Sequence, residues 1–97
     1  VQTCALPIYK IEGVGIGYEP PLWDPSLVDE VHTVSTGEAK EMTRRLAREE
    51  ALFGGTSSGA DVVAAIRVAE RLGQGATVVT LMADSGLKYV NTDVYRD

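Results

Sequence analysis

This sequence has few cysteines and no long apolar runs. Its 97 residues contain a single cysteine, Cys4, which excludes an internal disulfide and any metal site built from several cysteines. No apolar run approaches the roughly 20 residues that cross a bilayer. The sequence also does not open with a basic segment followed by an apolar block and a small-residue cleavage site. These absences predict a soluble, cytoplasmic protein.

Positive charge is also scarce. The chain has 9 lysines and arginines against 14 aspartates and glutamates, a net charge of -5, and the basic residues are scattered. Proteins that bind nucleic acid or anionic membranes gather basic residues into a patch, so neither partner is expected. The single histidine, His32, has no second ligand at convincing spacing, so no metal is expected. Hydrophobic residues make up 44% of the chain, which suits one small domain.

The first eight residues differ in character from the rest. Residues 1–8 are Val-Gln-Thr-Cys-Ala-Leu-Pro-Ile, which is what translation of a common sequencing-adapter oligonucleotide gives. We therefore predict that residues 1–8 are a non-native read-through segment and leave them out of the functional argument. On this interpretation the biological sequence, residues 9–97, begins near Tyr9 and was truncated there by the end of a sequence read.

Apolar periodicity predicts alternating strands and helices after a loop rich in glycine and proline, residues 9–28. Residues 30–34 alternate polar and apolar side chains, which predicts a short strand. Ser35 and Glu38 form a capping box, which predicts a helix from there to about Ala51. A brief strand is then expected at 52–53, a nearly all-apolar helix at about 59–72, and a buried strand at 76–82.

The order β-α-β-α-β predicts an α/β protein with a partial parallel sheet and covering helices. Three strands and two helices cannot cover both faces of a parallel sheet. The apolar second helix therefore needs partners beyond these elements, which indicates a missing N-terminal portion.

Two polar motifs follow predicted strands. Thr56, Ser57 and Ser58 lie between glycines where the brief strand meets the second helix, and Asp84-Ser85-Gly86 follows the last strand. Because the carboxyl ends of parallel strands share one edge of a sheet, we expect the two motifs to converge there on a small-molecule ligand. Taken singly, each has a simpler interpretation: a helix N-cap made by Ser57 or Ser58, and a turn at Asp84.

Five phrases of the sequence carry a family resemblance. They are Lys10-Ile11-Glu12-Gly13-Val14-Gly15, Ser26-Leu27-Val28-Asp29-Glu30-Val31, Leu46-Ala47-Arg48-Glu49-Glu50, Gly55-Thr56-Ser57-Ser58-Gly59-Ala60 and Asp84-Ser85-Gly86-Leu87-Lys88-Tyr89. In this order and at this spacing they resemble the cysteine synthase and cystathionine β-synthase family. The resemblance covers residues 9–97 and implies the C-terminal part of a domain with the tryptophan synthase β-like fold. It also implies pyridoxal 5'-phosphate as the cofactor.

The resemblance implies roles for particular residues. Ser57 matches the serine whose hydroxyl bonds the pyridine nitrogen, and a neutral hydroxyl leaves the ring a weaker electron sink than a carboxylate would. Further cofactor contacts are implied at Thr56, Ser58, Asp84 and Ser85, and the loop beside the substrate is matched by Gly13, Val14 and Gly15. Ala83, Leu87 and Lys88 depart from the proline and the Glu-Arg pair of many relatives, which leaves the substrate subfamily open.

The activity implied by the resemblance belongs to a parent enzyme, commonly a homodimer. That enzyme makes L-cysteine from O-acetylserine, or a related activated serine, and sulfide. Lys10 and Lys88 match noncatalytic positions, and the family's Schiff-base lysine lies upstream, so the chain alone is expected to be inactive. Cystathionine β-synthase and serine or threonine dehydratase, which share the fold, are alternatives. A non-catalytic α/β interaction module is a further one.

Overall fold

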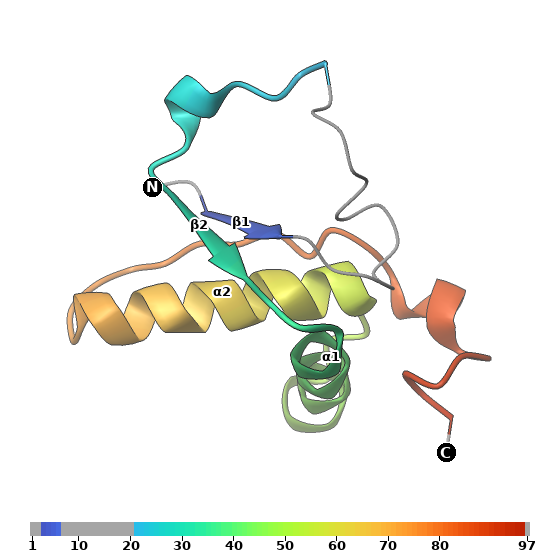
Figure 1. Ribbon diagram of the computed structural model, residues 1–97. Helices are drawn as coiled ribbons and strands as arrows, with labels where there is room; N and C mark the ends of the chain where they lie inside the picture. The colour runs from blue at the N-terminus through green and yellow to red at the C-terminus, as the bar shows by residue number, and fades with distance from the viewer. Residues whose placement is uncertain (1–2, 7–20, 97) are drawn as a thin grey trace.

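Two long helices dominate the computed structural model, which describes residues 3–6 and 21–96 (Figure 1). In chain order the elements are β1 (Thr3–Leu6), the 3₁₀ helix η1 (Pro25–Leu27), β2 (Glu30–Thr33), α1 (Thr36–Glu50), α2 (Thr56–Leu72) and the 3₁₀ helix η2 (Gly86–Tyr89). In Figure 1, α1 is seen nearly end-on below α2, and the two strands lie on the other side of α2. The helix α2 is therefore the central layer of the described residues.

The helix α1 begins at the predicted capping box. Ser35 is its N-cap: the Ser35 hydroxyl accepts from the Glu38 N–H at 3.1 Å, and the Glu38 carboxylate accepts from the Ser35 N–H at 2.9 Å. These two hydrogen bonds give partners to backbone N–H groups that the start of a helix would otherwise leave unsatisfied. The helix ends at Ala51, whose φ of 57° places a non-glycine residue in the left-handed region. The predicted capping box and helix are confirmed.

The sheet differs from the predicted one. Of the three predicted strands, 30–34 is confirmed as β2 (Glu30–Thr33), and it pairs in parallel with β1, with Cys4 opposite Val31. The predicted strands at 52–53 and 76–82 are wrong, since neither is a strand among the described residues. Apolar, β-branched composition favours an extended chain, but a strand also needs a neighbour to share its ladder. The strand β1 lies in the segment predicted to be non-native.

Residues 76–82, called here the return segment, run back alongside α2 (Figure 1). The segment leaves Val79 85% exposed and Leu81 74% exposed. Its apolar side chains therefore meet α2 on one side and solvent on the other.

Small side chains bring α1 and α2 close together. The core consists of Val34, Ala39, Ala60 and Ala64, with Val63 packed against them. A Cβ on Gly59 would meet the Thr43 hydroxyl and the Ala39 carbonyl oxygen, so the two backbones approach at a point where only glycine fits. The second helix was predicted from about residue 59, but α2 begins at Thr56, so the predicted serine motif is part of its first turn.

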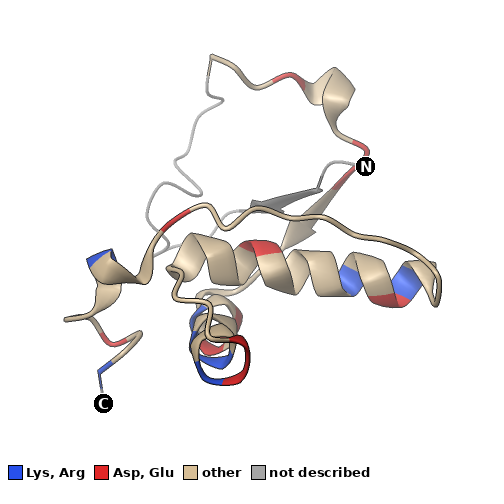
Figure 2. Cartoon of the chain, turned by 180° about the vertical axis from the view of Figure 1, so that it is seen from behind, with Lys and Arg blue, Asp and Glu red and all other residues tan. Residues whose placement is uncertain are grey.

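Charged residues are concentrated on α1 and in the last turns of α2, as Figure 2 shows from behind. The surface of α1 carries an i,i+4 ion pair between Arg45 and Glu49, at 2.8 Å. Such exposed pairs contribute little to stability. Within residues 3–6 and 21–96, no helix combines the length and the apolar character needed to cross a bilayer.

Candidate functional site

The two polar motifs meet at the start of α2, in a region that we call the junction, residues 54–59. The carboxylate of Asp84 receives backbone N–H groups from Gly55 at 2.9 Å, Ser58 at 3.1 Å and Ser57 at 3.3 Å. The Ser58 hydroxyl donates to the same carboxylate at 2.6 Å. The expected convergence of the two loops is thus confirmed by direct contacts between them.

The side chain that caps the N-terminus of α2 belongs to Asp84 and not to a residue of the junction. The N-cap of α2 is Gly55, and no side chain of the cap residue bonds to the first turn. The simpler interpretation, a local cap by Ser57 or Ser58, is therefore wrong. The free N–H groups of a helix N-terminus favour an anion, and here a carboxylate from 26 residues further along the chain supplies it.

The environment of Asp84 favours its charged form. Partial burial raises the pKa of this carboxyl, but hydrogen bonds from the Ser58 side chain and from the Ser58, Gly55 and Ser57 N–H groups outweigh it, so the pKa lies below its usual range. A Cβ on Gly55 would overlap the Asp84 carboxylate and the Tyr89 ring. Glycine at position 55 is thus required for the carboxylate to approach.

Other elements hold the carbonyl groups of the junction. The Tyr95 hydroxyl donates to the Gly54 carbonyl at 2.5 Å, and the Thr43 hydroxyl, on α1, lies 3.1 Å from the Gly55 carbonyl. Next to the junction, the Gly86 N–H donates to the Phe53 carbonyl at 2.9 Å. The backbone of the junction is therefore fixed from α1, from the Asp84 loop and from the C-terminal segment.

The predicted cofactor residues have different surroundings. Thr56 and Ser58 are buried, Ser57 is half-buried, and among the described residues the Thr56 hydroxyl has no hydrogen-bond partner. Ser85 is exposed and caps η2, its hydroxyl accepting from the Leu87 N–H at 3.2 Å. The predicted substrate-loop residues, Gly13, Val14 and Gly15, lie outside the described residues.

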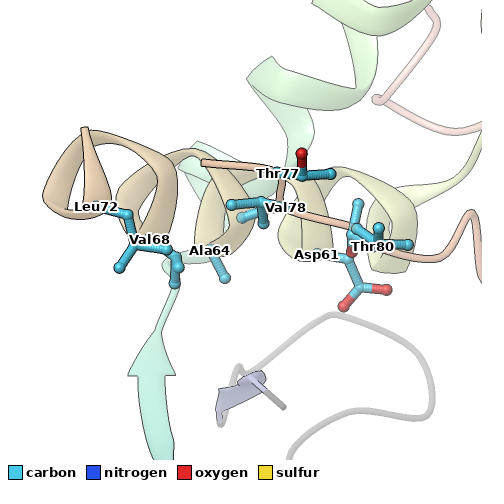
Figure 3. Close-up of a pocket in the computed structure, with 9 residues that line it drawn as sticks. Asp61, Ala64, Val68, Leu72, Thr77, Val78 and Thr80 are labelled. Atoms are coloured by element: carbon cyan, nitrogen blue, oxygen red, sulfur yellow. The ribbon is translucent and has the colours of Figure 1, made fainter. Parts of the chain in front are cut away.

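A groove of about 300 Å³ runs along α2, between this helix and the return segment (Figure 3). It is lined by Asp61, Ala64, Ala65, Val68 and Leu72 of α2 and by residues 77–80. Burial, and then the negative charge of Asp84, raise the pKa of Asp61. The groove therefore has a mixed lining, with apolar side chains of α2, the hydroxyls of Thr77 and Thr80, and one carboxyl, that of Asp61.

Three residues of this region were missed by sequence reasoning. Asp61 could have been found, because it follows Ser57 by one helical turn and i,i+4 residues share a helix face. Thr43 and Tyr95 carry no such signal, because a hydroxyl that holds a distant carbonyl has no local pattern in the sequence.

Comparison with known proteins defines the class first. Residues 1–84 match the family described as pyridoxal-phosphate dependent enzyme, and the chain belongs to that family. The prediction that residues 1–8 are non-native stays a prediction, although the matched range includes them.

Within this family, the chain is similar to cysteine synthases. The chain is 40% identical over 87 residues to the cysteine synthase of Staphylococcus aureus, covering 90% of this chain and 28% of that protein. The cysteine synthase structure from Entamoeba histolytica matches with a TM-score of 0.82 at 32% identity, covering 88% of this chain and 25% of that one. The O-acetylserine dependent cystathionine β-synthase of Helicobacter pylori matches with a TM-score of 0.82 at 36% identity, over 91% and 29%.

These matches confirm the predicted family, its pyridoxal-phosphate cofactor and the fold of these enzymes for the described elements. The chain spans between a quarter and a third of the length of the relatives it matches.

Proposed function

We propose that this chain forms the ring-nitrogen side of a pyridoxal 5'-phosphate site in an enzyme that makes L-cysteine from O-acetylserine, or a related activated serine, and sulfide. The observation that carries the proposal is the junction, where Asp84 fixes the turn that contains Ser57. The similarity to cysteine synthases supports the substrate class.

The junction suits the neutral end of the cofactor better than its phosphate. The first-turn N–H groups of α2, which would attract a phosphate, already bind the Asp84 carboxylate. A second anion there would meet a negative charge in a partly buried place. A serine hydroxyl, by contrast, can bond a neutral ring nitrogen, and the buried Thr56 hydroxyl, which has no partner among the described residues, offers a further polar group.

When bound, the cofactor supplies an electron sink for the amino acid's α-carbon. The part of this chain is to hold the ring. The Ser57 hydroxyl would bond the ring nitrogen without placing a formal charge beside it, which would moderate the sink and suit elimination of a β-substituent. Thr56 and Ser58 shape the turn, and we assign Gly13, Val14 and Gly15 to the loop beside the amino-acid substrate.

The test uses the intact protein that carries this chain, with Ser57→Ala as the variant and Ser26→Ala, in the exposed η1, as the matched control. Loss of one neutral hydrogen bond is expected to weaken cofactor binding by up to about tenfold, as measured by equilibrium dialysis. The control should bind as the unmodified protein does. Equal binding by the Ser57→Ala variant would contradict the proposed role.

A substrate panel separates the alternatives. Sulfide with O-acetylserine should give L-cysteine, whereas homocysteine as the preferred thiol would indicate a cystathionine β-synthase. Release of a keto acid from serine or threonine without a thiol would indicate a dehydratase. A protein that binds no cofactor would be an interaction module.

The proposal also includes a cytoplasmic homodimer as the working form of the enzyme.

The isolated chain is a further test, because the family's lysine is expected upstream of it. We expect no new visible absorbance after pyridoxal 5'-phosphate is added to the 97-residue chain. A band that borohydride reduces, mapped by mass spectrometry to Lys88 or Lys10, would contradict the assignment of both lysines as noncatalytic.

A further inference from the structure

Asp84 has little capacity left to bind a cofactor itself. Its Oδ1 atom receives the Gly55 N–H, the Ser58 N–H and the Ser58 hydroxyl, and its Oδ2 atom receives the Ser57 N–H. A carboxylate offers about four acceptor positions, so these donors use most of them. The sequence resemblance implied a cofactor contact at Asp84, but the geometry shows a group engaged with the protein.

We propose that Asp84 is a positioning residue that acts through Ser57, and this inference rests on the proposed function. Its carboxylate fixes the Ser57 N–H directly and fixes the next residue, Ser58, through both backbone and side chain. The backbone around Ser57 is therefore set before any ligand arrives. Preorganisation of this kind improves binding because less conformational freedom is lost on association.

The charge on Asp84 is required for this role. Hydrogen bonds to an ionised group are roughly twice as strong as neutral ones, and a carboxylate accepts from N–H groups with both oxygens. The side-chain amide of asparagine would accept with one oxygen and present two donors to N–H groups that are themselves donors. The titratable groups that feel this charge are Asp61 on α2 and Tyr95, and the negative charge of Asp84 raises the pKa of both, although burial is the larger cause.

The closing experiment is a double-mutant cycle in the intact protein, with cofactor dissociation constants measured by equilibrium dialysis. Asp84→Asn should weaken binding at least tenfold, and Ser57→Ala by up to about tenfold. If Asp84 acts through Ser57, Asp84→Asn should cost much less in the Ser57→Ala background. Additive effects would overturn the inference while leaving the proposed function intact. No effect of Ser57→Ala would instead refute the proposed role of Ser57.

Hydrogen exchange of the peptide spanning the junction gives a second readout, which does not need cofactor. Protection from exchange, which is the exchange rate of the unfolded chain divided by the observed rate at the same pH, should be high above about pH 4 and fall as the pH drops through the lowered pKa of Asp84. Ser58→Ala keeps the charge and removes one donor, so it should raise the exchange rate less than Asp84→Asn does. Asp93→Asn, which removes an exposed carboxylate paired with Lys40, is the matched control and should leave the junction unchanged. A junction that exchanges equally in all four proteins would also overturn the inference.

Discussion

The junction and the return segment both lie against α2, the junction at its N-terminal end and the return segment along its length, yet they are held in different ways. The junction, residues 54–59, is tied by hydrogen bonds from Asp84, Thr43 and Tyr95. The return segment, residues 76–82, lies along α2 and exposes apolar side chains such as Val79 and Leu81. Directional polar contacts define the conformation of the first region, whereas the second has a composition suited to a strand but pairs with no strand among the described residues.

This difference shows which parts of the structure depend on local chemistry. A carboxylate that accepts hydrogen bonds from the N–H groups of a helix N-terminus has its position fixed by those few directional contacts. A strand is specified only together with its neighbours, because its N–H and C=O groups point sideways to other chains or segments. The conformation of the junction is therefore specified by contacts within the described residues.

The largest expected effect comes from filling the contact between α1 and α2 under the junction. In Gly59→Ala, the new methyl group would meet the Ala39 carbonyl oxygen and the Thr43 hydroxyl, so the helices must separate. Forced overpacking of this kind costs about 3 kcal/mol. Urea unfolding followed by circular dichroism would measure it.

The matched control for this change is Gly37→Ala, also a glycine in a helix. A Cβ at Gly37 has nothing within 4 Å, so alanine is expected to stabilise α1 by about 0.5–1 kcal/mol. If both variants changed stability in the same direction, the close approach of α1 and α2 at Gly59 would be wrong.

A pair of valine truncations tests the contrast directly. Val34 is 0% exposed in the core and Val79 is 85% exposed in the return segment. Val34→Ala should cost about 2 kcal/mol, because two buried methyl groups are removed and a cavity is left. Val79→Ala should change stability by less than about 0.5 kcal/mol. Equal costs in the same unfolding assay would show that the return segment is packed as well as the core.

The smallest expected effect concerns Asp61, whose pKa is raised in the folded chain. A raised pKa means that the folded state binds a proton more tightly, so the ionised carboxylate opposes folding at neutral pH. Asp61→Asn should therefore stabilise the chain at pH 7, by less than about 1 kcal/mol. The gain should disappear as the pH falls below about 4, where the unmodified carboxyl is protonated in both states. Thermal unfolding at several pH values would measure this, and a gain that persists at pH 3 would contradict it.

Local signals in the sequence were sufficient for the helices and for the meeting of the two loops. The Ser35 and Glu38 box placed the start of α1 correctly, because both partners lie within one turn. The convergence of Ser58 and Asp84 followed from the expectation that both loops leave strands at one edge, although neither preceding segment is a strand among the described residues.

Non-local contacts account for what the sequence could not predict. Residues 76–82 have the apolar, β-branched composition of a buried strand. Whether they form one depends on hydrogen bonds to a neighbouring strand, which local sequence does not reveal. The Tyr95 hydroxyl bonds a carbonyl 41 residues away, and nothing around position 95 indicates that target. The role of Asp84 as a cap was hidden for the same reason, since its partner helix begins 28 residues earlier, at Thr56.

The distances in sequence across the junction also bear on biosynthesis. The ties to Asp84 and Tyr95 span 26 to 41 residues, so α2 is complete before either partner has been translated. At about 5–20 residues per second, the ribosome needs on the order of seconds to supply them. During that interval the first turn of α2 lacks these partners. The proposed cofactor-binding turn can thus reach its final form only after Asp84 and Tyr95 have been synthesised.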